Sequence, residues 1–196
     1  MPEFALFEHH RQSYALRLHE WRESASLSEK LALSLLFAVL AAVAAQMRIF
    51  LPFTPVPLTG QVLIVLLAGF VLGRFGMVSM GMYLVLGSAF GWFSGAIGVA
   101  ALSGLTAGYL FGFVLAAAVV GELAQRRKDW SLGQIVVVMS LAVGIIYLLG
   151  SFWLSLILGI GFSQALLLGA VPFVVVDAIK VLLASSVAYS ITPRRA

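Results

Sequence analysis

The chain has 196 residues, of which 62% are hydrophobic and only 10% charged, against about 25% charged residues in an ordinary globular domain. This composition predicts an all-α integral membrane protein, and the length leaves room for about six spans and no additional soluble domain. The absence of cysteine excludes a disulfide framework and a thiolate metal site. We attribute the net charge of +4 to the basic residues that set the orientation of a membrane protein, rather than to affinity for nucleic acid.

Residues 1–30 form a separate, charge-rich segment that lacks the pattern of a secretory signal. Apolar residues recur in it at helical spacing among charged ones, namely Tyr14, Leu18, Trp21 and Ala25. This pattern predicts a helix on the cytoplasmic membrane surface, with a loosely ordered tail as the alternative. Ser26 and Glu29 have the spacing of a capping box at the start of the first membrane helix.

Residues 31–191 are predicted to form a six-helix membrane domain, followed by a cytoplasmic tail at 192–196. The expected spans cover about 31–49, 58–73, 77–89, 106–123, 132–158 and 165–191. Three prolines between residues 52 and 57 predict an extended loop. The glycine-rich stretch 91–104 is predicted to be a re-entrant or loop segment, because irregular backbone at membrane depth is tolerated when it is buried in protein or lines a cavity.

The distribution of lysine and arginine predicts that both termini are cytoplasmic. With this orientation the outer loops carry only Arg48, whereas the other basic residues outside the spans lie on the inner side. Residues 54–57, the segment before Tyr109 and residues 159–164 then share the outer side. We therefore expect a ligand pocket that faces outward.

Asp177 and Lys180 are the strongest candidates for function. They lie near the middle of an otherwise uncharged stretch, where each charge costs several kcal/mol unless it is paired or faces a polar cavity. Their spacing of three places both side chains on one face of a helix. The alternative is a structural pair that neutralises itself or joins two helices. Pro172 lacks an amide donor, so we expect the Leu168 carbonyl to be free and the helix to bend toward a cavity beside Asp177.

A second candidate set lies where a helix is predicted to begin after Leu105. Exposed amides near Thr106 are suited to an anion or carboxylate, and Tyr109 and Trp92 are available to pack against a ring. The alternative reading is close helix packing through the glycines of this stretch. On the first span, Ala38 and Ala42 form a small-residue face suited to another helix.

The sequence shows no sign of catalysis or of a cofactor. It has no phosphate-binding loop, and its histidines, His9, His10 and His19, all precede the predicted spans, where they indicate a solvated surface rather than a metal site.

Four motifs, in this order, make the chain resemble the BioY family. They are Leu51-Pro-Phe-Thr-Pro-Val-Pro-Leu-Thr-Gly-Gln61, Leu67-Ala-Gly-Phe-Val-Leu-Gly73, Thr106-Ala-Gly-Tyr-Leu-Phe-Gly-Phe113 and Val171-Pro-Phe-Val-Val-Val-Asp-Ala-Ile-Lys180. The resemblance covers about residues 31–191. It implies a multi-pass protein of a bacterial or archaeal-type cell membrane that binds biotin for uptake and is not an enzyme. It also implies two kinds of partner, a transmembrane coupling subunit and a pair of ATPase subunits.

The resemblance also implies roles for individual residues. Asp177 and Lys180 match an Asp-x-x-Lys motif expected to contact the ligand, Tyr109 matches a Gly-Gly-Tyr element, and Gln61 follows the proline-rich loop. Ala38 and Ala42 resemble the face that docks on the coupling subunit. The chain departs from the family at 104–109, which reads Gly-Leu-Thr-Ala-Gly-Tyr, so backbone amides near Thr106 are expected to hold the biotin carboxylate.

Three other functions remain compatible with the sequence. They are a subunit for another vitamin, an intramembrane enzyme whose acid and base are supplied by Asp177 with Lys180, and a structural membrane subunit that uses these charges for assembly.

Overall fold

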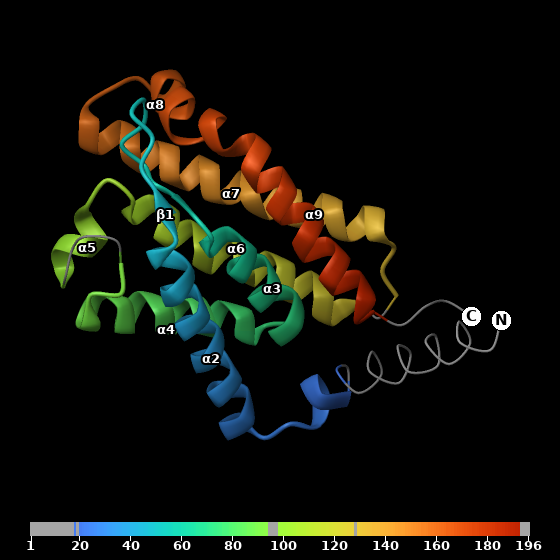
Figure 1. The fold of residues 1–196 in the computed structure, drawn as a ribbon. Coiled ribbons are helices and arrows are strands. Elements are labelled where there is room, and N and C mark those ends of the chain that lie inside the picture. The colour runs from blue at the N-terminus through green and yellow to red at the C-terminus, as the bar shows by residue number, and fades with distance from the viewer. Residues whose placement is uncertain (1–17, 19, 94–97, 128, 193–196) are drawn as a thin grey trace.

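The computed structural model describes residues 18, 20–93, 98–127 and 129–192. Within these ranges the chain is almost entirely helical (Figure 1). The helices are α2 (Leu27–Gln46), α3 (Gln61–Leu72), α4 (Phe75–Phe90), α5 (Val99–Ser103), α6 (Ala107–Arg126), α7 (Leu132–Leu158), α8 (Phe162–Gly169) and α9 (Val174–Ser190). A 3₁₀ turn, η1 (Val171–Phe173), joins the last two helices.

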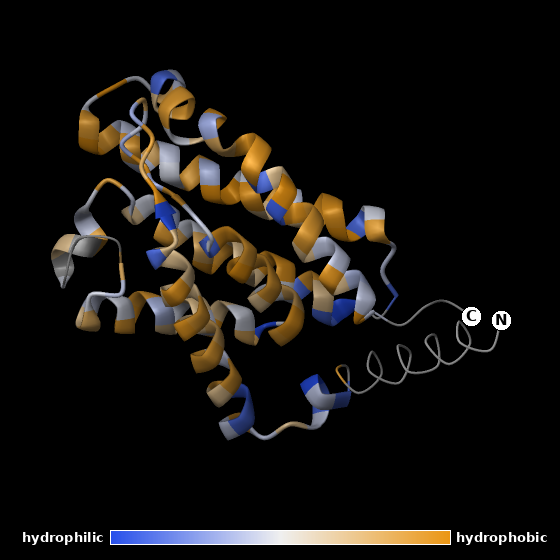
Figure 2. Ribbon diagram, viewed as in Figure 1, coloured by the Kyte–Doolittle hydropathy of each residue, from blue (hydrophilic) through white to orange (hydrophobic). Residues whose placement is uncertain are grey.

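The helices match the apolar pattern of the sequence, as Figure 2 shows. In the described part of the chain, four stretches are long and apolar enough to cross a membrane: Leu27–Gln46, Ala107–Arg126, Leu132–Leu158 and Phe162–Ser190. Helices α3 and α4 are also apolar but shorter, with 12 and 16 residues. An ideal 12-residue helix is about 18 Å long, less than the hydrocarbon thickness of a bilayer. The count of six spans therefore stays a prediction.

The predicted capping box is present at the start of α2. The Ser26 hydroxyl accepts a hydrogen bond from the Glu29 amide, and the Glu29 carboxylate accepts one from the Ser26 amide. Before it, residues 20–24 are helical, and their predicted place on the membrane surface stays a prediction. The rest of that prediction, at residues 1–17 and 19, lies outside the described ranges, as does the tail beyond Thr192.

The predicted proline-rich loop folds as a short β-ribbon rather than as an unpaired connection. Strand β1 (Arg48–Ile49) pairs antiparallel with β2 (Leu58–Thr59), with Arg48 opposite Thr59. The prolines lie between the two strands, where their missing amides cost no ladder hydrogen bond. Below we call residues 48–59 the hairpin.

The expected sixth helix is interrupted at Pro172 rather than continuous. Helix α8 ends at Gly169 and the chain passes through η1 before α9 begins. As predicted, the carbonyl one turn before the proline is available, because the Leu168 oxygen accepts a hydrogen bond from the Thr54 hydroxyl at 2.6 Å. The break therefore ties the hairpin to α8.

Helices α3 and α6 approach each other through glycine. A methyl group added at Gly69 would lie 2.8 Å from the Ala117 carbonyl oxygen, and one added at Gly121 would overlap the Gly73 carbonyl. Glycine at these positions lets the two backbones touch. Helix α2 packs against α4 and α3 with a buried side made of small residues, which include Ala38, Ala41 and Ala45.

Candidate ligand-binding site

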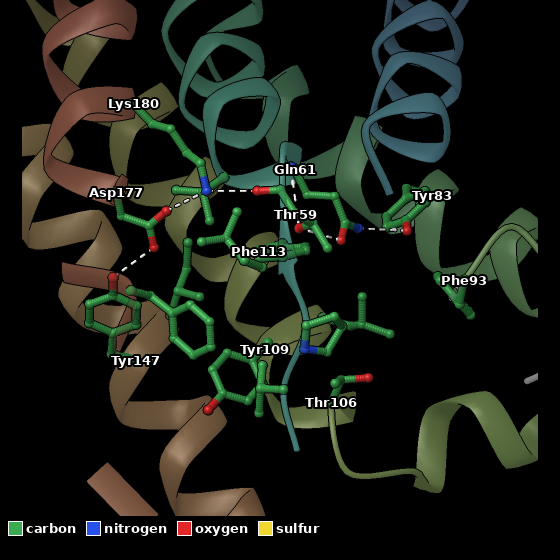
Figure 3. A pocket seen from close by; sticks show the side chains of 17 residues that line it. Thr59, Gln61, Tyr83, Phe93, Thr106, Tyr109, Phe113, Tyr147, Asp177 and Lys180 are labelled. Atoms are coloured by element: carbon green, nitrogen blue, oxygen red, sulfur yellow. Dashed lines mark hydrogen bonds and ion pairs between the residues drawn. The ribbon is translucent and has the colours of Figure 1, made fainter. Parts of the chain in front are cut away.

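One pocket is lined by 17 residues from the hairpin, η1 and helices α3, α4, α6, α7 and α9, with part of the loop after α4 (Figure 3). Both Asp177, in the first turn of α9, and Lys180, one turn later, line it. Gln61 at the start of α3 and Thr106 and Tyr109 at the start of α6 line it as well. The structure thus brings together five of the six residues predicted to bind the ligand.

Asp177 and Lys180 form an ion pair. The Lys180 ammonium donates to one Asp177 carboxylate oxygen at 2.6 Å, and the two side chains are 12% and 5% exposed. Lys180 donates a second hydrogen bond, also 2.6 Å long, to the Thr59 carbonyl of β2. The other Asp177 oxygen accepts a hydrogen bond of 2.6 Å from the Tyr147 hydroxyl of α7. Neither buried charge is left without a partner, so the pair can persist inside the protein.

A second series of hydrogen bonds runs along the pocket through Gln61. The Thr59 hydroxyl donates to the Gln61 side-chain oxygen at 3.0 Å, and the Gln61 amide donates to the Tyr83 hydroxyl at 2.7 Å. Gln61 is 6% exposed. Both ends of its side-chain amide are engaged, which fixes the orientation of the group before any ligand arrives.

Tyr109 presents its ring to the pocket and its hydroxyl elsewhere. The hydroxyl donates to the Gly169 carbonyl of α8 at 2.8 Å, and the ring lies against Gly150 of α7. A side chain at Gly150 would overlap the ring, so this glycine makes the slot in which Tyr109 fits. A ligand would therefore meet the aromatic ring of Tyr109 rather than its hydroxyl.

Thr106 lines the pocket immediately before α6, and its side chain forms no capping hydrogen bond. The nearby amides of Ala107 and Tyr109 already donate to the carbonyls of Gly104 and Thr106, at 3.1 and 3.0 Å. These two amides are therefore not free to bind an anion, whereas the Thr106 hydroxyl faces the pocket without a capping bond; the anion site itself stays a prediction.

Trp92 lies outside the set of lining residues, and its neighbour Phe93 belongs to it. The Trp92 ring stacks on Phe90 with centroids 5.9 Å apart, whereas Phe93 meets Tyr83 edge to face at 5.2 Å. A helix ends at Phe90 and Gly91 adopts a left-handed backbone, with φ of 70°, so sequence spacing could not show which of the two rings turns inward.

Ala38 and Ala42 do not face outward in this structure. They are 0% and 9% exposed, on the buried side of α2. Large residues such as Leu36 and Val43 cover the exposed side instead. Both residues pack within the chain, and their predicted role in docking on a coupling subunit stays a prediction.

Sequence reasoning missed Thr59, Tyr83, Phe113 and Tyr147 as pocket residues. Tyr147 offered a usable signal, because a hydroxyl in the middle of an apolar helix needs a hydrogen-bond partner. Nothing in the local sequence identified Asp177 as that partner.

The pocket combines a fixed carboxylate, an ammonium group and aromatic walls, and among the described residues no cluster of metal-binding side chains occurs. With the long apolar helices around it, this site defines a multi-pass membrane protein with a partly open pocket of mixed polar and aromatic lining. The model of the BioY family matches residues 16–196, and the chain belongs to that family.

Two relatives illustrate the similarity. The chain is 40% identical to the biotin transporter BioY of Thermotoga maritima over 147 residues, which cover 71% of this chain and 83% of the relative. It is 37% identical to a probable biotin transporter BioY of Pyrococcus horikoshii, over 78% of this chain and 90% of the relative.

The fold also matches a solved structure, the S-component for biotin from an ECF-type ABC transporter. The TM-score is 0.73 at 24% identity, and the match covers 82% of this chain and 89% of that one. The helical architecture is therefore that of an ECF S-component.

Proposed function

We propose that this chain binds biotin in the pocket of Asp177 and Lys180 and mediates its uptake. The main support for this proposal is that the ion pair has donors and acceptors that form no hydrogen bond within the protein. Lys180 has three N–H donors and uses two of them, while each Asp177 oxygen accepts one hydrogen bond and can accept another. The pair thus offers one donor and two acceptors.

A cyclic urea such as the head group of biotin has the complementary set, with one carbonyl oxygen and two N–H groups. The carboxylate accepts from ureido N–H groups and the ammonium donates to the ureido oxygen. The rings of Tyr109, Phe113 and Phe93 enclose the apolar part of the bicyclic head group. Thr106 lies on the same pocket wall as Tyr109, at the start of α6, and donates to the valerate carboxylate. The names of the relatives support the same ligand.

Transport requires an energy source outside this chain. We propose that a transmembrane coupling protein and two ATPase subunits supply it, as the S-component architecture suggests. In this proposal the chain crosses the membrane six times, has both termini in the cytoplasm, and opens its pocket to the outside. Reconstitution with and without candidate ATPase subunits, followed by uptake of labelled biotin, tests the energy requirement. Equal ATP-driven uptake without them would contradict it.

The ligand is tested on protein purified without added biotin. Denaturation followed by mass spectrometry should release biotin, and calorimetry on the emptied protein should give a submicromolar Kd. Biotin methylated on a ureido nitrogen should bind at least tenfold more weakly, because one N–H donor is lost. No released biotin and no affinity below the micromolar range would overturn the proposal, and tight binding of a different vitamin would replace the ligand.

The head-group role is tested by Asp177→Asn, with Glu122→Gln as the matched control. Truncating one partner of a buried charge pair costs about 2 to 5 kcal/mol of binding free energy, or at least a 30-fold rise in Kd. Asp177→Glu should lose less, since it keeps the carboxylate. Glu122 lies near the other end of α6, outside the pocket, and pairs with Arg74 and Arg126 on the surface, so its variant should keep wild-type affinity. Unchanged binding in Asp177→Asn would reject the role.

A further inference from the structure

The guanidinium group of Arg22 lies against the ends of two helices. It donates hydrogen bonds to the carbonyls of Val71 at 3.0 Å, Ala124 at 3.2 Å and Phe70, and it sits 5.9 Å from the centroid of the Phe70 ring. The residue is 9% exposed. All three carbonyls belong to the last turn of α3 or α6, where backbone carbonyls find no N–H donor within their own helix. One cation thus caps two helices at their negative ends.

The two capped helices are in backbone contact at the same end. Gly69 of α3 faces the Ala117 carbonyl of α6, and Gly121 of α6 faces the Gly73 carbonyl just after α3. At Gly121 the neighbouring atoms are all backbone atoms, and at Gly69 the Ala117 backbone is joined only by Cβ of Val120. A close-packed contact of this kind transmits displacement rather than absorbing it.

At their opposite ends the same helices build the pocket. Helix α3 begins at Gln61 and α6 carries Thr106 and Tyr109 at its start. Arg22 therefore holds one end of a pair of rods whose other ends, about 18 Å away along α3, position ligand-binding groups.

We infer that residues 20–24 form a strap in which Arg22 clamps α3 to α6 and thereby positions the walls of the ligand pocket. Arg22 is a positioning residue in this scheme, because it touches no part of the pocket. The effect on affinity rests on the proposed function, whereas the mechanical coupling between the two ends of the helices does not.

The chemistry of the group suits a clamp. Burial lowers the pKa of Arg22 to about 10, so the side chain remains charged at neutral pH. Its planar fork reaches carbonyls of two helices at once, which the point charge of lysine does less well. Other arginines at this end, Arg74 and Arg126, instead lie on the surface, with side chains 61% and 70% exposed, and pair with Glu122.

The test compares Arg22→Gln and Arg22→Lys with Arg126→Gln, which removes an exposed guanidinium from the last turn of α6. Hydrogen exchange of the ligand-free protein reports on both ends of α3 and α6, and calorimetry gives the Kd for biotin. We expect Arg22→Gln to accelerate exchange at the pocket ends as well as at the capped ends and to raise Kd about tenfold. Arg22→Lys should be intermediate, and Arg126→Gln should match the wild type.

A folded Arg22→Gln protein with wild-type Kd, and with faster exchange confined to residues 20–24 and the last turns of α3 and α6, would overturn the inference. If Arg22→Gln does not fold, Kd and hydrogen exchange of Arg22→Lys are compared with those of the wild type instead, and the same result would overturn the inference. If the wild type binds no biotin, the proposed function fails, and exchange at Gln61 and Tyr109 still tests the clamp.

Discussion

Replacing Asp177 and Lys180 singly and together should give losses of stability that do not add. In Asp177→Asn the buried ammonium loses its counter-charge, and the new amide group points a donor at Lys180 or Tyr147. In Lys180→Gln the carboxylate keeps the Tyr147 hydroxyl but loses its cation. The double variant leaves no buried charge without a partner, and the new Asn and Gln side-chain amides can form a hydrogen bond with each other.

The size of the effect follows from the burial of the pair, at 12% and 5% side-chain exposure. Removing one partner of a buried pair costs about 3 to 5 kcal/mol, mostly because the other charge is left uncompensated. For a domain of this length a loss of about 3 kcal/mol lowers the melting temperature by about 6 to 12 °C. Two independent losses would sum to about 6 kcal/mol or more, whereas we expect the double variant to lose less than about 3 kcal/mol.

Thermal unfolding of the three variants and the wild type in the same detergent measures this cycle. A parallel measurement of biotin affinity separates stability from recognition, because all three variants should bind weakly even where the double variant regains stability. Additive losses in melting temperature would refute the idea that the two charges stabilise each other. Wild-type affinity in the double variant would show that the pair is structural only.

Three further predictions concern packing and positioning around the pocket. Gly121→Ala should lower the melting temperature by several degrees, because its methyl group would meet the Gly73 carbonyl, whereas Gly133→Ala, which lies in open space, should not. Equal melting temperatures of the two variants would contradict the close contact at Gly121. Tyr147→Phe removes the donor to Asp177 and keeps the ring, so Kd should rise about tenfold with little change in expression; an unchanged Kd would show that the carboxylate needs no orientation. Tyr109→Phe should cost about 1 kcal/mol of stability and leave Kd within threefold, since only the bond to α8 is lost; a large loss of affinity would place the hydroxyl in ligand binding.

Features that depend on neighbouring residues could be predicted from the amino-acid sequence. Long apolar stretches identified the membrane helices, and a spacing of three placed Asp177 and Lys180 on one face. The missing amide of Pro172 predicted the free carbonyl at Leu168 and a bend in the last helix, which the structure shows as a full break before α9. Each of these follows from backbone geometry within one or two turns.

Contacts between groups far apart in the sequence could not be predicted, because they depend on how the helices pack. Tyr147 is 30 residues from Asp177, and the Thr59 carbonyl is 121 residues from Lys180, so no local pattern pairs them. Small residues at Ala38 and Ala42 predicted a close helix neighbour, and the structure shows that these two residues lie on the side of α2 that is buried within the same chain.

The burial of Arg22 is the clearest example of a feature that the sequence could not predict. Its sequence context is that of a solvated charge in a polar segment. The two helices that it contacts end 50 and about 100 residues later, and their last carbonyls have no donor within the helix. The guanidinium group is buried because it donates hydrogen bonds to these carbonyls. Unpaired backbone groups are created by helix ends, and their position in space is set by how whole helices pack.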